Sequence, residues 1–273
     1  PGVQHMRHTH LPEHKFVKGQ PDTGVEMAED LERIAMNFGG ENIAACIVEP
    51  IAGSTGTLVP PKGYLKRIRE ICDKHGILLI FDEVITGWGR TGSAFASQEF
   101  GVTPDMITMA KATTNGVIPM GVVAVKEEMY DAVLDTSKNP EGTPELFHGY
   151  TYSGIPAAVA AGLAVQDIFD KEDIFNRAKE MSPYFQDGLH SLKDLKEVVS
   201  IRGYGMMGGI EMKMKEKPGK SGFQTFKHCY DVGVNFKNTG DTLIIAPQFI
   251  CEKKHIDEII EKLRTGISNY SKS

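Results

Sequence analysis

Two short runs of consecutive apolar residues alternate with two helical patterns in the first part of the chain. Apolar residues recur at helical spacing over Val25–Phe38 and again over Lys62–His75. Between and after them lie the continuous runs Ile43–Val48 and Ile77–Phe81, which are typical of strands buried on both faces of a sheet. This alternation of strand and helix predicts an α/β fold with a mostly parallel sheet.

Polar residues whose side chains could take part in catalysis or binding follow these apolar runs. Glu49 comes directly after the first run, Asp82 ends the second, and Lys111 follows a further strand candidate at Met106–Met109. Another strand is expected at Gly121–Val125. Because ligands bind at the carboxyl ends of parallel strands, we expect the three polar side chains to lie at one edge of the sheet.

The later part of the chain predicts a smaller α+β domain. Pro156–Phe169 is rich in alanine and indicates a long helix, and Asp173–Leu195 indicates a second one, broken or kinked near Pro183. Short strands are expected at 208–212, 234–236 and 242–245, followed by a final amphipathic helix. We place part of a large domain at residues 1–165 and the small C-terminal domain at residues 166–273.

Composition and charge narrow the class of protein. Of 273 residues, 41% are hydrophobic and 24% charged, which is ordinary for a globular protein. The formal net charge of −6 argues against a nucleic-acid partner, and no apolar stretch has the length to cross a membrane. The four cysteines form no CxxC pair, so we expect reduced core thiols in a cytoplasmic protein.

A histidine-rich stretch opens the chain, with His5, His8, His10 and His14 close together. Their spacing fits no regular metal-ligand pattern, so we expect no metal site and favour a surface loop.

Asp82 and Lys111 each allow a structural and a functional interpretation. Asp82 is either a turn residue or a carboxylate that holds a proton on a heteroaromatic nitrogen, which would make that ring a better electron sink. Lys111 is either a surface lysine or a desolvated amine able to form an imine. The small residues Ala112–Gly116 after it would let the backbone approach a ligand closely.

Four motifs in order carry a resemblance to a known family. IVEPIAGSTG, LLIFDEVITGWGRTG, PDMITMAKATTNGVIPMGVV and FHGYTYSGIP resemble the class III aminotransferases, which are fold-type I enzymes that use pyridoxal 5′-phosphate. The interval from Asp82 to Lys111 also matches the family. The resemblance covers nearly the whole chain but only the later part of a family member. The serine- and glycine-rich phosphate turn of the family is not found, so the sequence is expected to be a fragment lacking the N-terminal part.

The resemblance implies a role for each matching residue. Lys111 would be the Schiff-base lysine, Asp82 would pair with the cofactor's ring nitrogen, and Val84 would pack on the ring face. Thr151 resembles the threonine that reaches the phosphate of the neighbouring subunit's cofactor, which implies a homodimer. Glu49 matches an acidic position near the cofactor, and a purely structural hydrogen-bonding role remains open for it.

Departures from other branches of the family indicate the substrate. Ser54 stands where ornithine- and 4-aminobutyrate-type members carry a glutamate, and Ile85 stands where many relatives carry glutamine. The motifs look more like the omega-amino acid:pyruvate branch. However, Lys237 occupies the position of that branch's carboxylate-binding arginine, and lysine cannot offer a bidentate fork. Carboxylate recognition is therefore expected to be looser or relocated.

Two alternatives to this function stay open at the level of sequence. The chain could be a class III member that acts on a diamine, an ornithine-like donor or a biotin-pathway ketone. It could also be a truncated, catalytically silent domain.

Overall fold

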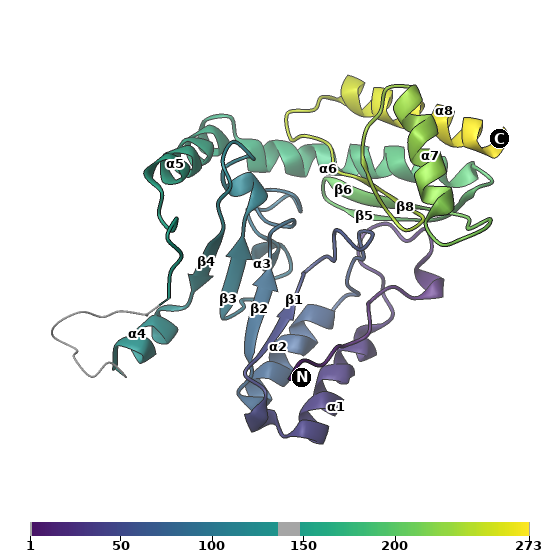
Figure 1. The fold of residues 1–273 in the computed structure, drawn as a ribbon. Helices are drawn as coiled ribbons and strands as arrows, with labels where there is room; N and C mark the ends of the chain where they lie inside the picture. The colour runs from purple at the N-terminus through teal and green to yellow at the C-terminus, as the bar shows by residue number, and fades with distance from the viewer. Residues whose placement is uncertain (1, 136–147, 273) are drawn as a thin grey trace.

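The computed structural model describes residues 2–135 and 148–272, and it contains two four-stranded sheets joined by a long helix (Figure 1). The first sheet has the order β1 (Ala45–Val48), β2 (Leu78–Asp82), β3 (Met106–Met109) and β4 (Val122–Val125). The pairs β1–β2 and β2–β3 are parallel, and β4 is antiparallel to β3. The predicted α/β class and mostly parallel sheet are confirmed.

Only one face of this sheet is covered within the described residues. Leu79 and Phe81 of β2 are fully buried against the helical layer, as the apolar run predicts. Ile47 of β1, in contrast, is 60% exposed, and Val123 and Val125 of β4 are exposed as well. The prediction that Ile43–Val48 is buried on both faces is therefore wrong for this chain, because β1 is an edge strand with one face open.

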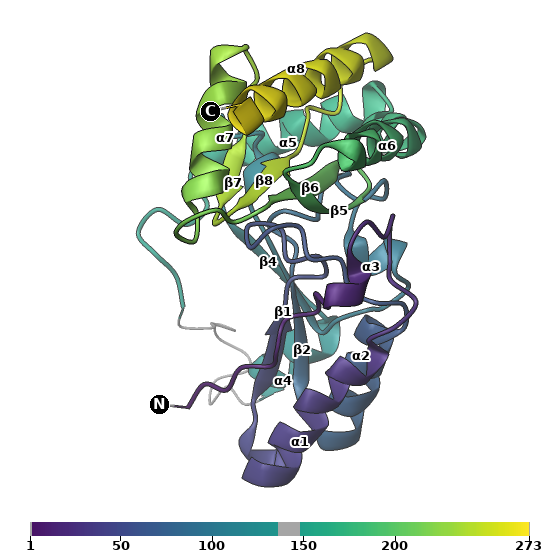
Figure 2. The same ribbon diagram turned by 90° about the vertical axis from the view of Figure 1, so that its right-hand side faces the viewer.

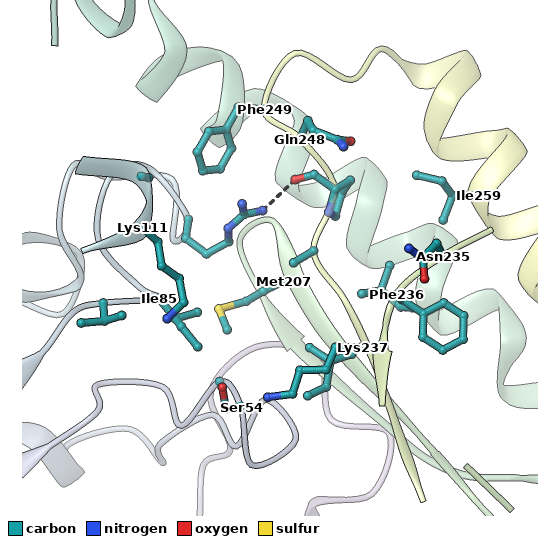
Figure 3. A pocket seen from close by; sticks show the side chains of 18 of the residues that line it. Ser54, Ile85, Lys111, Met207, Asn235, Phe236, Lys237, Gln248, Phe249 and Ile259 are labelled. Carbon is teal, nitrogen blue, oxygen red and sulfur yellow. Dashed lines mark hydrogen bonds between the residues drawn. The ribbon is translucent and has the colours of Figure 1, made fainter. Parts of the chain in front are cut away.

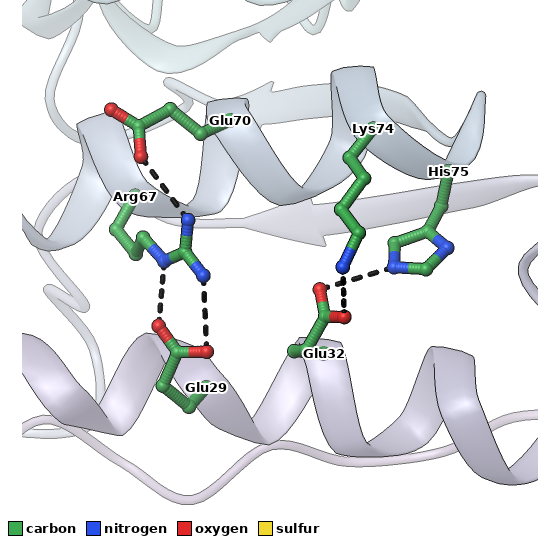
Figure 4. Close-up of polar contacts among 6 residues, drawn as sticks. All are labelled: Glu29, Glu32, Arg67, Glu70, Lys74 and His75. Atoms are coloured by element: carbon green, nitrogen blue, oxygen red, sulfur yellow. Dashed lines mark hydrogen bonds and ion pairs between the residues drawn. The ribbon is translucent and has the colours of Figure 1, made fainter.

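Helices α1 (Glu29–Phe38) and α2 (Tyr64–His75) form the layer beside this sheet. The apolar stripe predicted for α2 is buried, and this helix ends at Gly76, whose left-handed φ of 68° suits glycine. In α1 the stripe is buried at Leu31, but Phe38 at the end of the helix is 51% exposed. The polar sides of the two helices meet in ion pairs (Figure 4). Arg67 donates two hydrogen bonds to the Glu29 carboxylate. Glu32 is contacted by both Lys74 and His75. These pairs are partly exposed, so they orient the helices more than they stabilise them.

The second sheet is antiparallel and has the order β5 (Val198–Tyr204), β6 (Met207–Met212), β8 (Thr242–Ile245) and β7 (Lys237–Thr239). Three helices pack on one of its faces, as Figure 2 shows, and enclose the larger apolar core. They are α6 (Ile174–His190), α7 (Lys220–Asp231) and α8 (Lys253–Lys272). The predicted smaller α+β unit is confirmed.

Helix α5 (Pro156–Lys171) joins the two sheets. Residues 165 and 166 both lie inside this helix, so the division into domains at that point stays a prediction. The N-terminal segment also bridges the two parts: the Gly19 amide donates to the Gly203 carbonyl, 3.2 Å away, and Phe16 packs on the second core. The remaining helices are short: α3 (Ala96–Glu99) and α4 (Glu127–Asp135).

Three details of the second half differ from the sequence prediction. The strand expected at 234–236 begins instead at Lys237, which places Phe236 against the core and Lys237 on the exposed edge. β5 was not predicted, because Arg202 and Gly203 interrupt its apolar pattern. Pro183 lies inside α6 without ending it, so the predicted break is wrong and a kink at this position stays a prediction.

The predicted surface loop at the N-terminus is correct for His5 and His8, which are exposed. It is wrong for His14, which is buried and contacts the Thr23 carbonyl at 3.0 Å. Within residues 2–135 and 148–272, no cluster of three potential metal ligands is found, and no helix is long and apolar enough to cross a membrane. All four cysteines are buried and free, as predicted.

Candidate active site

The carboxyl ends of three parallel strands bring Glu49, Asp82 and Lys111 to one edge of the first sheet. Glu49 directly follows β1, Asp82 is the last residue of β2, and Lys111 opens a short 3-10 turn just after β3. Asp82 pairs in register with Thr108 of β3, three positions before Lys111. The shared sheet edge predicted from the strand pattern is therefore present.

One of the two carboxylate oxygens of Asp82 accepts a hydrogen bond from the protein. Its Oδ1 accepts a hydrogen bond of 3.0 Å from the backbone N–H of Val84. The second oxygen, Oδ2, has no hydrogen-bond partner among the described residues. The carboxylate is half-buried at a strand end, so it retains an acceptor for an additional group.

Lys111 has an unusual backbone conformation. Its φ of 49° is left-handed, which few residues other than glycine adopt without strain. The Gly116 and Thr114 amides both donate to the Lys111 carbonyl, so the following turn fixes this geometry. The side chain is exposed and points into a pocket beside Ile85 and Met207 (Figure 3). Of the two interpretations of Lys111, a surface lysine and a desolvated amine, the desolvated amine is not found within this chain alone.

The pocket around Lys111 has a volume of about 450 Å³ and lies between the two sheets. One wall comes from the first part of the chain, including Val84, Ile85 and Lys111, and the other from residues 234–237 and 244–249. Its charged lining residues are Arg90, Lys111 and Lys237, and no aspartate or glutamate lines it among the described residues. Such a pocket favours an anionic ligand.

These features fit pyridoxal 5′-phosphate as a cofactor. The group needs an amine that reaches its carbonyl carbon, a carboxylate for its ring nitrogen and apolar contact for its ring. Lys111 and Val84 line the pocket and supply the amine and the apolar contact. Asp82 is not among the lining residues, but its free Oδ2 lies at the end of β2, two positions before Val84.

Glu49 has a structural partner. Its Oε2 accepts a hydrogen bond of 2.9 Å from the Gly53 amide, which shapes the loop that carries Ser54. Gly53 and Ser54 line the pocket, but Glu49 does not. Glu49 therefore acts on the pocket through the loop.

Thr151 and Lys237 occupy different surroundings. Lys237 begins β7, and its ammonium lies beside Ser54 at the mouth of the pocket (Figure 3). Thr151 is exposed and does not line this pocket, so the chain does not bring it to its own Lys111. Of the motif that contains Thr151, Phe147 lies outside the described residues.

Sequence reasoning missed Arg90 as a pocket residue. The arginine follows Trp88-Gly89 in the GWGRTG motif, and its guanidinium enters the pocket between the two walls. A charged residue inside an otherwise small and apolar motif was the available signal.

Comparison with known proteins places this geometry in a family. The model of the class III aminotransferases matches residues 1–267. An omega-aminotransferase of Caulobacter vibrioides is 51% identical over 265 residues, covering 96% of this chain and 60% of that protein. A beta-alanine–pyruvate aminotransferase of Pseudomonas aeruginosa is 42% identical over 268 residues, covering 97% of this chain and 60% of the relative.

Solved structures agree with this result. The omega transaminase of Pseudomonas jessenii, solved in complex with PMP, superimposes with a TM-score of 0.87 at 29% identity. That match covers 93% of this chain and 57% of the other. The chain belongs to the class III aminotransferases, a family of pyridoxal-phosphate-dependent fold-type I enzymes. It spans about 60% of the length of the curated relatives described above.

Proposed function

We propose that this chain carries the cofactor-binding and catalytic core of an aminotransferase that moves an amino group from an omega-amino acid or amine to pyruvate. The observation that carries the proposal is the placement of Asp82 and Lys111 at the carboxyl ends of adjacent parallel strands, beside a pocket whose charged lining residues, among those described, are all cationic. The names of the relatives, which include omega-aminotransferase and beta-alanine–pyruvate aminotransferase, support the choice of substrates.

Pyridoxal 5′-phosphate, when bound, supplies an electron sink for the charge that develops on the substrate carbon. The residues of this chain prepare that role. Asp82, through its free Oδ2, would hold a proton on the ring nitrogen, and the Val84 amide keeps its other oxygen in place. Val84, which lines the pocket, would supply apolar contact to the ring and limit the access of water.

Lys111 acts as nucleophile and proton carrier. Its amine would hold the cofactor through the cofactor's carbonyl group and, when free, would carry a proton at the substrate's α-carbon. The 3-10 turn at Lys111–Thr113 fixes the backbone from which the Lys111 side chain extends. The apolar side chains of Ile85 and Met207 lie beside it in the pocket.

Lys237 supplies a cation for the substrate carboxylate. No hydrogen bond or ion pair engages its ammonium within the described residues, and Ser54 beside it carries no charge to neutralise it. A point charge attracts a carboxylate without imposing a bidentate geometry. This arrangement suits short keto acids such as pyruvate.

We further propose that the active form is a homodimer in which Thr151 serves the neighbouring subunit's cofactor. Thr151 is exposed between two exposed aromatic side chains, Tyr150 and Tyr152. Val117 and Leu163 are further large apolar side chains that are open to solvent in a single chain. Exposed apolar surface of this kind is typical of protein interfaces.

The decisive experiment is a visible absorption spectrum of the purified protein after addition of pyridoxal 5′-phosphate. We expect a cofactor band that disappears in Lys111→Ala and persists in Lys62→Ala, which changes an exposed lysine paired with Asp22. A colourless protein would refute the proposal and leave a catalytically silent domain. A screen of amine donors with pyruvate and with 2-oxoglutarate then tests the acceptor; activity with 2-oxoglutarate alone contradicts the pyruvate assignment.

A further inference from the structure

Arg90 places a second type of cation in the pocket, with a geometry that Lys237 lacks. Its Nη1 donates to the carbonyl oxygens of Met206 and Pro247, each 2.8 Å away. Its guanidinium carbon lies 4.3 Å from the centre of the Phe249 ring, so the aromatic face also holds the group. The guanidinium is thereby fixed on one side before any ligand arrives.

The opposite edge of the guanidinium is free. Neither Nε nor Nη2 has a hydrogen-bond partner among the described residues, and neither is sealed from the pocket that Arg90 lines. These two N–H groups form the side-on fork that matches the two oxygens of a carboxylate. An exposed lysine ammonium cannot offer this fork.

Among residues 2–135 and 148–272, no acidic side chain pairs with Arg90. Its contacts are two carbonyls and an aromatic ring, and the described lining of the pocket contains no carboxylate. Burial lowers the pKa of Arg90 to about 10, so the side chain still carries its charge at neutral pH. Burying a cation without an anionic partner raises the free energy of the protein, and binding of an anion lowers it again.

We propose that Arg90 is a substrate-recognition residue that binds the carboxylate of the keto acid or amino acid through its Nε–Nη2 edge. Two residues thus share carboxylate recognition. The guanidinium edge of Arg90 binds from the wall formed by the first part of the chain, and the Lys237 ammonium binds from the wall that carries β7. The identity of the ligand as a substrate rests on the proposed aminotransferase function; the presence of a carboxylate site does not.

The test measures binding of propionate to the purified protein by saturation-transfer NMR, without and with pyridoxal 5′-phosphate, with propionamide as the uncharged analogue. We expect Arg90→Gln to raise the dissociation constant of propionate by about ten- to hundredfold, as for loss of charge-assisted hydrogen bonds. Arg90→Lys keeps the charge without the fork and should give an intermediate loss. Propionamide binding should change little in either variant.

Arg177→Gln is the matched control. Arg177 also donates to a carbonyl of the same C-terminal segment, that of Ile250 at 2.6 Å, but it does not line the pocket. Its removal should leave propionate binding unchanged. If Arg90→Gln binds propionate as the unaltered protein does, or loses propionate and propionamide equally, the proposal is overturned. Should Arg90→Gln fail to fold, Arg90→Lys decides by the same comparison.

The outcomes separate this inference from the proposed function. A Lys111-dependent cofactor band together with Arg90-independent propionate binding would remove the carboxylate role alone. Arg90-dependent propionate binding in a protein without that band would leave a carboxylate site and refute the enzyme. In the active protein, Arg90→Gln should raise the KM for pyruvate far more than the KM for an amine donor that has no carboxylate.

Discussion

The Nε of Arg202 in β5 donates a hydrogen bond of 2.8 Å to the carbonyl oxygen of Gly56, across the boundary between the two sheets. The same side chain, only 5% exposed, reaches Glu211 at 2.7 Å and Thr242 at 3.2 Å. Gly53 and Ser54 line the pocket and lie in the same loop as Gly56, so this arginine ties the loop to the second sheet. The position of Ser54 relative to Lys111 therefore depends on Arg202.

Replacing Arg202 should both destabilise the protein and loosen the pocket. In Arg202→Met the Gly56 carbonyl and Glu211 lose their cationic partner inside a packed region. We expect the free energy of unfolding to fall by about 3 kcal/mol, measured by urea denaturation. Arg264→Met is the control, because Arg264 binds Asp194 on the exposed surface. That change should cost less than about 1 kcal/mol; equal losses in both variants would contradict the role of Arg202.

Asp105 gives the stability of the first sheet a dependence on pH. Burial by itself would raise the pKa of this carboxyl, but Lys126, the Leu79 amide and Arg69 outweigh it and lower the pKa to about 2. A carboxyl with a depressed folded-state pKa stabilises the protein fully above its unfolded pKa of about 3.9. That contribution is lost as the pH falls from about 4 towards 2.

The prediction compares the unaltered protein with Asp105→Asn across this range. At neutral pH the variant should be less stable by about 3 kcal/mol. Arg69 and Lys126 lose their shared buried carboxylate and keep only the more exposed Asp73 and Glu128. The difference should shrink below about pH 4, as followed by thermal or urea denaturation at each pH. Asp22→Asn, at an exposed ion pair with Lys62, should show little difference at any pH. If the difference in unfolding free energy between Asp105→Asn and the unaltered protein stays the same down to pH 2, the depressed pKa of Asp105 is contradicted.

The sequence predicted the parts of the fold whose signals are local. Phe81 and Leu79 belong to a continuous apolar run, and Gly76 marks the end of a helix, so β2 and α2 could be located before the structure was seen. The strand ends then placed Asp82 and Lys111 together, because parallel strands share a carboxyl edge.

Other parts depend on contacts distant in the sequence. Arg202 interrupts the apolar pattern of β5, and its burial makes sense only once Gly56 and Thr242 are beside it. Arg90 enters the pocket because Pro247, far along the chain, holds it there. Long-range pairs of this kind leave no periodic signal in the sequence.

Gly205 in the turn between β5 and β6 should tolerate no larger residue. Its φ is +56°, and a Cβ there would lie 2.3 Å from the Arg90 carbonyl oxygen. Gly205→Ala is expected to lower the free energy of unfolding by about 3 kcal/mol or more, since backbone must move. Gly76→Ala isolates the conformational cost, because Gly76 also has a positive φ but nothing within 4 Å. The free energy of unfolding of Gly76→Ala should fall by only about 1 kcal/mol. Chemical denaturation measures both variants. Similar losses in the two would show that a clash at Gly205 does not determine the effect.

Ser54 and Lys237 should together set the affinity for a carboxylate substrate. Ser54→Glu places an anion beside the Lys237 ammonium, which would then pair internally and compete with the substrate. We expect the KM for pyruvate to rise by about tenfold, since a charge-assisted contact is worth roughly that factor, while the KM for an uncharged amine donor changes little. Ser54→Ala removes the hydroxyl without adding charge and should leave both constants near their original values. Equal effects of the glutamate and alanine variants on pyruvate would show that the hydroxyl, rather than the free charge of Lys237, governs recognition.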